Sequence, residues 1–262
     1  MKQTADYGNN QEYIFNDEKK KKAAINAKSS AFLSKVFGYL SIFVLITAIV
    51  AAGLGLLMSY LWGKAINSGN DALLERTTVG FFIAMVISAV GVFVLSMIIN
   101  IKGISGKSVL PFAIPYSILM GVLLSTFVMF IDWYYLVLAF LITALSFAFI
   151  YLIGKVVKVN ISVVILIASS MFFGALILSF SFFIFYIIAP ALFNWIYVGI
   201  TAIIYVAVFL FIAVDIWQIQ RIAEAGENSN NLAMFCGFRL YVDFIYLFIR
   251  ILLLILRFAK KN

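Results

Sequence analysis

The sequence contains no histidine and only one cysteine among its 262 residues. Without an imidazole, the chain cannot build a Ser–His–Asp protease site, a histidine-ligated zinc site or a histidine proton relay. A single cysteine, Cys236, cannot form an internal disulfide or a cysteine zinc cluster. Acid–base or metal chemistry in this chain would therefore have to be carried by carboxylates.

Charged residues are also scarce, at 11% of the chain, whereas hydrophobic residues make up 65%. A chain of this composition lacks enough polar surface to cover a soluble core. Helical runs of about 20 apolar residues are long enough to cross a hydrocarbon layer of ~30 Å. We identify seven such runs, so the sequence predicts an all-α membrane protein with seven transmembrane helices at about 36–62, 77–101, 109–131, 133–154, 161–189, 194–217 and 235–258.

The net charge of +8 is unevenly distributed over the segments between these runs. If the N-terminus is cytoplasmic, twelve basic residues lie in cytoplasmic segments and five lie outside. This bias predicts a cytoplasmic N-terminus and an external C-terminus, and it accounts for the charge without a nucleic-acid partner. We expect a disordered basic tail at 1–32, a transmembrane domain at 33–258 and a short external tail at 259–262.

Few charges lie inside the apolar runs, and those few are spaced regularly. Asp215 lies in the sixth run, and the seventh carries a stripe along one helical face. An ionisable group within a bilayer is costly and usually faces protein or water. The pattern therefore predicts that the seventh helix is central, with its stripe against other helices or a wet cavity; the stripe comprises Arg239, Asp243, Tyr246, Arg250 and Arg257.

The predicted topology places Asp215 and Asp243 in the cytoplasmic third of adjacent helices, where they can meet. Each aspartate also has a simpler explanation without a functional role. Asp215 would be hydrated at the membrane interface, and Asp243 would form a structural ion pair with Arg239. Aspartyl proteolysis is disfavoured because the tripeptide PAL at 190–192 precedes the sixth run and no Gly-x-Gly turn accompanies Asp243. We therefore expect no enzyme. A cation site and proton switch remains, since two close acids cannot both ionise cheaply.

Four segments of the chain resemble one known family. They are FLSKVFGYLSIFVLITAIVA, PFAIPYSILMGVLLSTFV, DIWQI and RLYVDFIYLFIRILLLILRF, and together they extend from about residue 33 to 258. The chain is similar to the transmembrane Bax inhibitor motif family, also called Bax inhibitor-1-like proteins. This resemblance implies a seven-helix fold in which six helices wrap a central seventh. It also implies a pH-sensitive calcium leak in which Asp215 and Asp243 share a proton and control the pore.

The resemblance bears on the expected site and partners. Some family members carry in the second helix an arginine that contacts the aspartate pair, but residues 77–101 contain no charge here, so Lys102 or Arg239 is expected to take that place. Ca²⁺ is expected as a permeant or transiently bound ion held by Asp215 and Asp243, without another cofactor. The supporting polar contacts are expected from Gln218, Arg239, Tyr246, Arg250 and Lys102.

A second role is consistent with the same resemblance. Some bacterial relatives act by binding a membrane protease, so a regulatory membrane protein with structural aspartates is the alternative to a channel. The composition, rich in Phe, Ile, Lys and Asn, favours a bacterial plasma or inner membrane. Residues 218–234 join the two acid-bearing runs, and we expect a mobile linker that lets the separation of these runs change.

Overall fold

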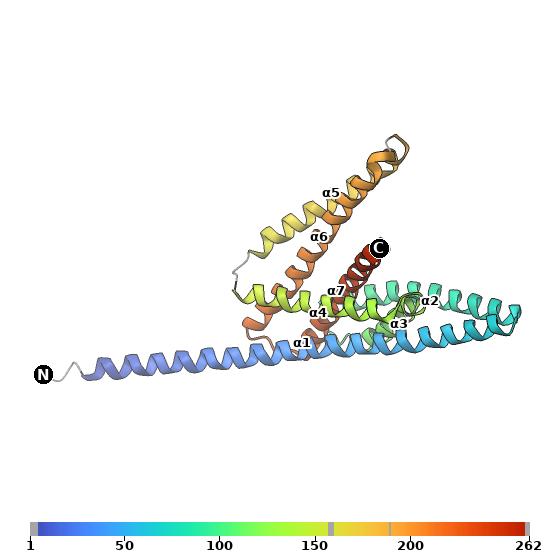
Figure 1. Ribbon diagram of the computed structural model, residues 1–262. Helices are drawn as coiled ribbons and strands as arrows, with labels where there is room; N and C mark the ends of the chain where they lie inside the picture. The colour runs from blue at the N-terminus through green and yellow to red at the C-terminus, as the bar shows by residue number, and fades with distance from the viewer. Residues whose placement is uncertain (1–4, 157–159, 189, 260–262) are drawn as a thin grey trace.

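The computed structural model describes residues 5–156, 160–188 and 190–259 (Figure 1). Within these residues the backbone forms seven α-helices, which confirms the predicted all-α class. Residues 1–4 of the predicted basic tail and residues 260–262 of the predicted external tail lie outside the described residues. The helices are α1 (Ala5–Asn67), α2 (Asp71–Ile104), α3 (Leu110–Phe130), α4 (Trp133–Val156), α5 (Ile161–Ile188), α6 (Pro190–Glu224) and α7 (Asn230–Ala259).

Five helices of the described part contain stretches long and apolar enough to cross a membrane. Large apolar side chains such as Ile49, Leu56 and Phe93 are exposed along them, which is typical of surfaces that face lipid. α7 is not among these five helices, and it carries the charged stripe. The chain is thus built as a multi-pass membrane protein, with candidate spans at Asn26–Asn67, Asp71–Ile104, Leu110–Phe130, Trp133–Gly154 and Gly199–Glu224.

The N-terminal segment differs from the disorder that the sequence predicts. α1 begins at Ala5, so residues 5–32 form a helix that continues without interruption into the first apolar run. This segment contains no proline and only one glycine, Gly8, and several of its residues are Ala, Lys, Glu or Gln, which favour helix. An existing helix extends at one hydrogen bond per residue, without the cost of a new nucleus. The composition of this segment thus supports the continuation of α1 beyond the apolar run.

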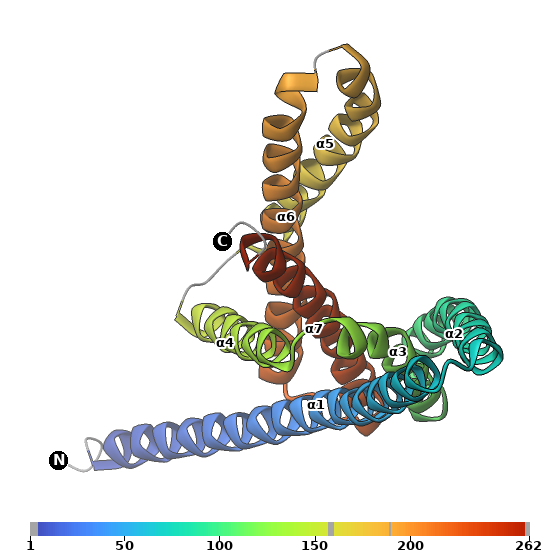
Figure 2. The same cartoon turned by 45° about the vertical axis from the view of Figure 1, so that its right-hand side comes forward.

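α7 lies among most of the other helices (Figures 1 and 2). It packs against α1, α2, α4 and α6, and Tyr116 of α3 reaches its side chains. α5 packs along α6, and much of this pair projects away from the remaining helices. The described residues thus surround α7 with five helices, whereas the sequence predicts six.

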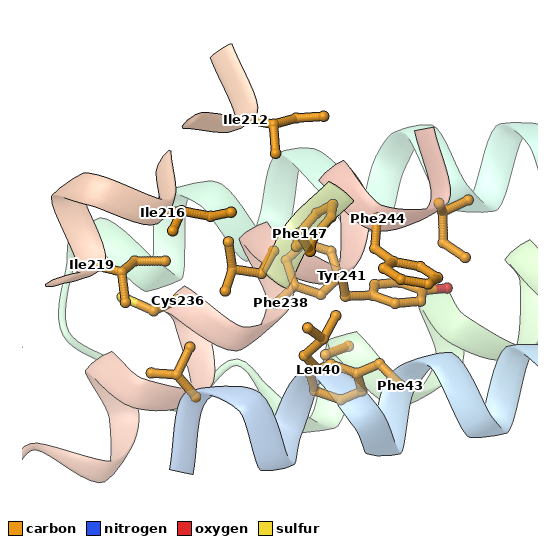
Figure 3. Close-up of a cluster of buried hydrophobic side chains, with 14 of the residues drawn as sticks. Leu40, Phe43, Phe147, Ile212, Ile216, Ile219, Cys236, Phe238, Tyr241 and Phe244 are labelled. Carbon is orange, nitrogen blue, oxygen red and sulfur yellow. The ribbon is translucent and has the colours of Figure 1, made fainter. Parts of the chain in front are cut away.

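An aromatic cluster holds α7 against α1 and α3. The rings of Tyr116 and Phe238 lie 4.9 Å apart, and those of Phe43 and Tyr241 lie 5.8 Å apart. Figure 3 shows Phe43, Phe238 and Tyr241 within a continuous buried core that extends to α6. Edge-to-face aromatic pairs add to the free energy of burial and restrict the ways in which the rings can pack. The cluster therefore restricts how α7 lies relative to α1 and α3.

Aromatic side chains also gather at the ends of α1 and α3 and the start of α4. The rings of Trp62 and Phe130 lie 5.9 Å apart, and α4 begins with the exposed side chains of Trp133 and Tyr134. Tryptophan and tyrosine are enriched at the boundary between hydrocarbon and water. This end of the molecule, which we call the aromatic end, is thus the expected level of one membrane interface.

Candidate functional site

Two helices carry acidic side chains into one interface. On α6, Ile212, Ile216 and Ile219 recur at helical spacing and are buried toward α7 (Figure 3). Asp215 lies among them, so the packing of this face places its side chain, 19% exposed, between the two helices. On α7, Asp243 lies next to the buried Phe244. The structure thus brings the two aspartates of the sequence prediction together.

The carboxyl groups of Asp215 and Asp243 are neighbours, within reach of a side-chain hydrogen bond. Such a bond requires a proton on one of them, because ionised carboxylates only accept. When both groups are ionised, the Oδ2 atom of Asp243 is buried without a hydrogen-bond partner among the described residues. A buried acceptor without a donor is costly, so the arrangement favours a state in which a proton or a cation lies between the acids.

Arg239 supplies the positive charge at this site. Its guanidinium donates to Asp215 Oδ1 and forms an ion pair across the interface between α6 and α7. It also lies close enough to attract the carboxylate of Asp243. The alternative of a simple pair between Arg239 and Asp243 within α7 is therefore incomplete, because the direct partner is Asp215. In the described part of the chain, one guanidinium faces two acids.

Lys102 does not reach the acid pair. Its Nζ atom lies 4.0 Å from the centre of the Phe112 ring, where a cation–π contact stabilises it. Of the two basic residues that the sequence offered for the contact with the aspartates, the structure therefore selects Arg239. The reason is geometric, since Arg239 lies one helical turn before Asp243 on the same helix whereas Lys102 lies near the end of α2.

The charged stripe of α7 divides into two groups. Arg239 and Asp243 face α6, whereas Arg250 donates to the Tyr246 hydroxyl at 2.8 Å and lies over the Tyr246 ring. The hydroxyl of Tyr205 on α6 donates to the backbone oxygen of Arg250 at 2.7 Å. Tyr246 is 42% exposed, so this second group lies at the surface of the protein. The two predicted supporting residues Tyr246 and Arg250 thus contact each other.

Sequence reasoning missed the glutamine that fixes α6 against α4. Gln220 is buried and donates to the Tyr151 carbonyl at 2.9 Å, and the Trp217 indole donates to the Ile150 carbonyl at 3.3 Å. Gln218, the predicted supporting residue, is only half-buried. The sequence feature that could have indicated this contact is the spacing of three residues between Trp217 and Gln220, which places both side chains on one helical face. Gly154 permits this contact, because a Cβ atom there would overlap both side chains.

The connection between the two acid-bearing helices is shorter than predicted. α6 continues to Glu224 and α7 begins at Asn230, so the connection comprises residues 225–229 rather than 218–234. Lys35 of α1 donates to the side-chain oxygens of Asn228 and Asn230 at 3.0 and 2.8 Å. Gly226 adopts a φ of 82°, a conformation that favours glycine in a tight turn. The predicted length of this connection is thus wrong, and the turn is hydrogen-bonded to α1.

The site has few ligands for a metal ion. The described residues contain no group of three or more His, Cys, Asp or Glu side chains that would hold one. Ca²⁺ prefers six to eight oxygen ligands, of which Asp215 and Asp243 supply at most four. The arrangement fits an ion that is bound weakly and keeps much of its water.

An all-helical chain with several apolar spans and an ion-paired acid cluster between two helices belongs to the class of multi-pass membrane proteins. The family model described as "Inhibitor of apoptosis-promoting Bax1" matches residues 29–260, and the chain belongs to this family. Comparisons with curated proteins and with solved structures give no match.

Proposed function

We propose that this protein is a pH-sensitive, calcium-permeable leak channel whose gate is the pair formed by Asp215 and Asp243. The observation that carries the proposal is the buried Oδ2 atom of Asp243, which has no donor among the described residues although it adjoins Asp215. One guanidinium cannot neutralise two carboxylates, so the fully ionised site keeps a net negative charge. A proton or a cation removes that charge.

The two protonation states of the pair have different mechanical consequences. When the acids share one proton, the hydrogen bond between them holds α6 and α7 together. When both acids are ionised, their repulsion favours separation of the helices or recruits Ca²⁺. Calcium flux therefore rises as the pH rises through the range in which the shared proton is lost. The Arg239–Asp215 ion pair links α7 to α6 and so opposes the separation of the two helices.

The proposal includes a membrane arrangement of seven spans, with α7 as the central span. The N-terminus is cytoplasmic and the C-terminus external, in a bacterial plasma or inner membrane. The acid pair then lies toward the cytoplasmic side, the same side as the contact of Lys35 with Asn228 and Asn230. That contact supports the placement, because it ties the start of the first span to the turn between α6 and α7.

Purified protein in liposomes that contain a trapped calcium dye tests the proposal. We expect wild-type flux to depend on pH, Asp215→Asn and Asp243→Asn each to flatten the pH profile, and the double variant to add little more. Asp132→Asn is the matched control, because Asp132 is exposed in the turn between α3 and α4. Its profile should match wild type.

Two results would contradict the channel proposal. Additive effects of the two substitutions, or a pH profile that survives both, would show that the pair is not the switch. Absence of any calcium flux from folded protein would favour the alternative, a regulatory membrane protein that binds a membrane protease or another partner.

A further inference from the structure

A cavity lies apart from the acid site, and none of its lining residues belongs to α6 or α7. It is a groove of about 490 Å³ between α1, α2 and α3, and seven of its lining residues lie on α2. These residues recur every three or four positions from Arg76 to Ser88, so they share one helical face. Leu54 and Met58 of α1 and Val122 of α3 complete the walls. We call this cavity the α2 groove.

The α2 groove is apolar along its length and carries a positive charge at one end. Arg76 lies at that end, and the described residues offer no carboxylate in contact with its guanidinium. Glu75 and Asp71 lie in the same helical turns but at about 100° and 140° from Arg76 around the axis. They are exposed, and neither lines the groove. Among the described residues that line the groove, Arg76 is the one that carries a charge.

The dimensions of the groove match one leaflet of a bilayer. Twelve residues of α-helix separate Arg76 from Ser88, which corresponds to about 18 Å along the axis. One leaflet contributes about half of the ~30 Å hydrocarbon thickness. Arg76 lies near the start of α2, close in the chain to the end of α1, where Trp62 marks the aromatic end. The charged end of the groove is thus at the interface, and its apolar part descends toward the bilayer centre.

We propose that the α2 groove binds one glycerophospholipid of the bilayer, with its phosphate on Arg76 and an acyl chain along α2 toward Ser88. A phosphodiester complements the guanidinium, which can donate two parallel hydrogen bonds to it. The acyl chain fills a cavity that would otherwise leave its lining without contacts. This site is independent of the acid pair and of the proposed channel activity.

Gly80 makes the site testable without loss of the fold. A Cβ atom built at Gly80 meets no other atom within 4 Å, although this residue lines the groove. A larger side chain there begins in open space and projects into the groove that the acyl chain would occupy, and replacing glycine also raises helix propensity. Gly53 on α1 is equally open but lines no part of this groove, so Gly53→Phe is the matched control.

The experiment uses full-length protein in vesicles that contain a small fraction of phosphatidylglycerol with a photoreactive diazirine on its acyl chain. After illumination, adducts are mapped to peptides. We expect adducts on the groove face of α2 within 80–88, a loss of about tenfold with Arg76→Gln, and near-complete loss with Gly80→Phe. Lys64→Gln, which removes an exposed charge in the last turn of α1, should leave the adduct yield unchanged.

Two further measurements distinguish recognition of the lipid phosphate from binding of the acyl chains or of free phosphate. A diacylglycerol probe with the same chains but no phosphate should label the groove about tenfold less, whereas soluble inorganic phosphate should not compete with the lipid. Equal labelling by both lipid probes, or equal effects of Arg76→Gln and Lys64→Gln, would overturn the assignment of the phosphate. Labelling that Gly80→Phe leaves unchanged would overturn the site. Protection of the buried Cys236 from a maleimide confirms that each variant is folded.

Discussion

Replacing Arg239 by methionine tests how much the protein depends on the ion pair between α7 and α6. Methionine has a similar length and keeps the apolar contacts, but it leaves Asp215 next to Asp243 without the guanidinium. Loss of one partner from a fully buried pair costs ~3–5 kcal/mol, and an exposed pair contributes ~0–1 kcal/mol. The side chains of Arg239 and Asp215 are 38% and 19% exposed. We therefore expect Arg239→Met to lower the free energy of unfolding by about 2 kcal/mol.

The single cysteine provides the assay. Cys236 is buried on α7 one turn before Arg239, so a thiol-reactive fluorogenic maleimide reports thermal opening of α7. A loss of ~2 kcal/mol should lower the midpoint of labelling by about 4–8 °C for a chain of this size. At lower pH the labelling midpoints of Arg239→Met and wild type should lie closer together, because protonation of the acids removes the negative charge that Arg239 balances.

Arg250→Met is the matched control, because it removes another arginine of the α7 stripe that bonds to the Tyr246 hydroxyl. We expect Arg250→Met to lower the midpoint temperature of Cys236 labelling by less than half as much as Arg239→Met does. Adding Asp215→Asn to Arg239→Met should recover part of the loss, since the unpaired charge is then gone. Equal labelling midpoints for Arg239→Met and Arg250→Met would show that the ion pair does not stabilise α7. The same conclusion would follow if the midpoint of the double variant stayed as low as that of Arg239→Met.

Two further predictions concern topology and the anchoring of α7. A reporter fused after Asn262 should be external and one inserted near Asn230 cytoplasmic; finding both on one side would exclude α7 as a span. Tyr241→Phe removes a 2.6 Å bond to Thr47 and should lower the Cys236 labelling midpoint by about 2–4 °C, for ~1 kcal/mol. Thr47→Val should lower it further because Thr47 also donates to the Ser117 carbonyl, and equal midpoints would contradict that network.

Some of the local structure could be read from the sequence because it depends on composition and spacing. Apolar runs of sufficient length indicated helices, and the spacing of Arg239, Asp243 and Arg250 placed them on one side of α7. The limits of these helices were less predictable. α6 continues past Asp215 to Glu224 because Trp217 and Gln220 pack against α4, a stabilisation that hydropathy does not contain.

Contacts within the acid site depended on the tertiary structure. The helical spacing permitted a pair between Arg239 and Asp243, and only the approach of α6 made Asp215 the direct partner of Arg239. Similarly, the charge of Lys102 was evident, but the position of the Phe112 ring determined where that charge lies. Spacing along one helix fixes angles within that helix, whereas contacts between helices depend on the packing of both faces.

The sequence by itself determined the class of protein, because hydrophobicity and charge bias are sums over residues and do not depend on which helices meet. It also excluded histidine chemistry and a cysteine cluster, because the chain contains no histidine and one cysteine. Only the tertiary structure decided that the Oδ2 atom of Asp243 has no donor in the described part of the chain and that Arg76 lies at one end of an apolar groove. Burial and cavities arise where several helices converge, and each helix contributes only part of the surface.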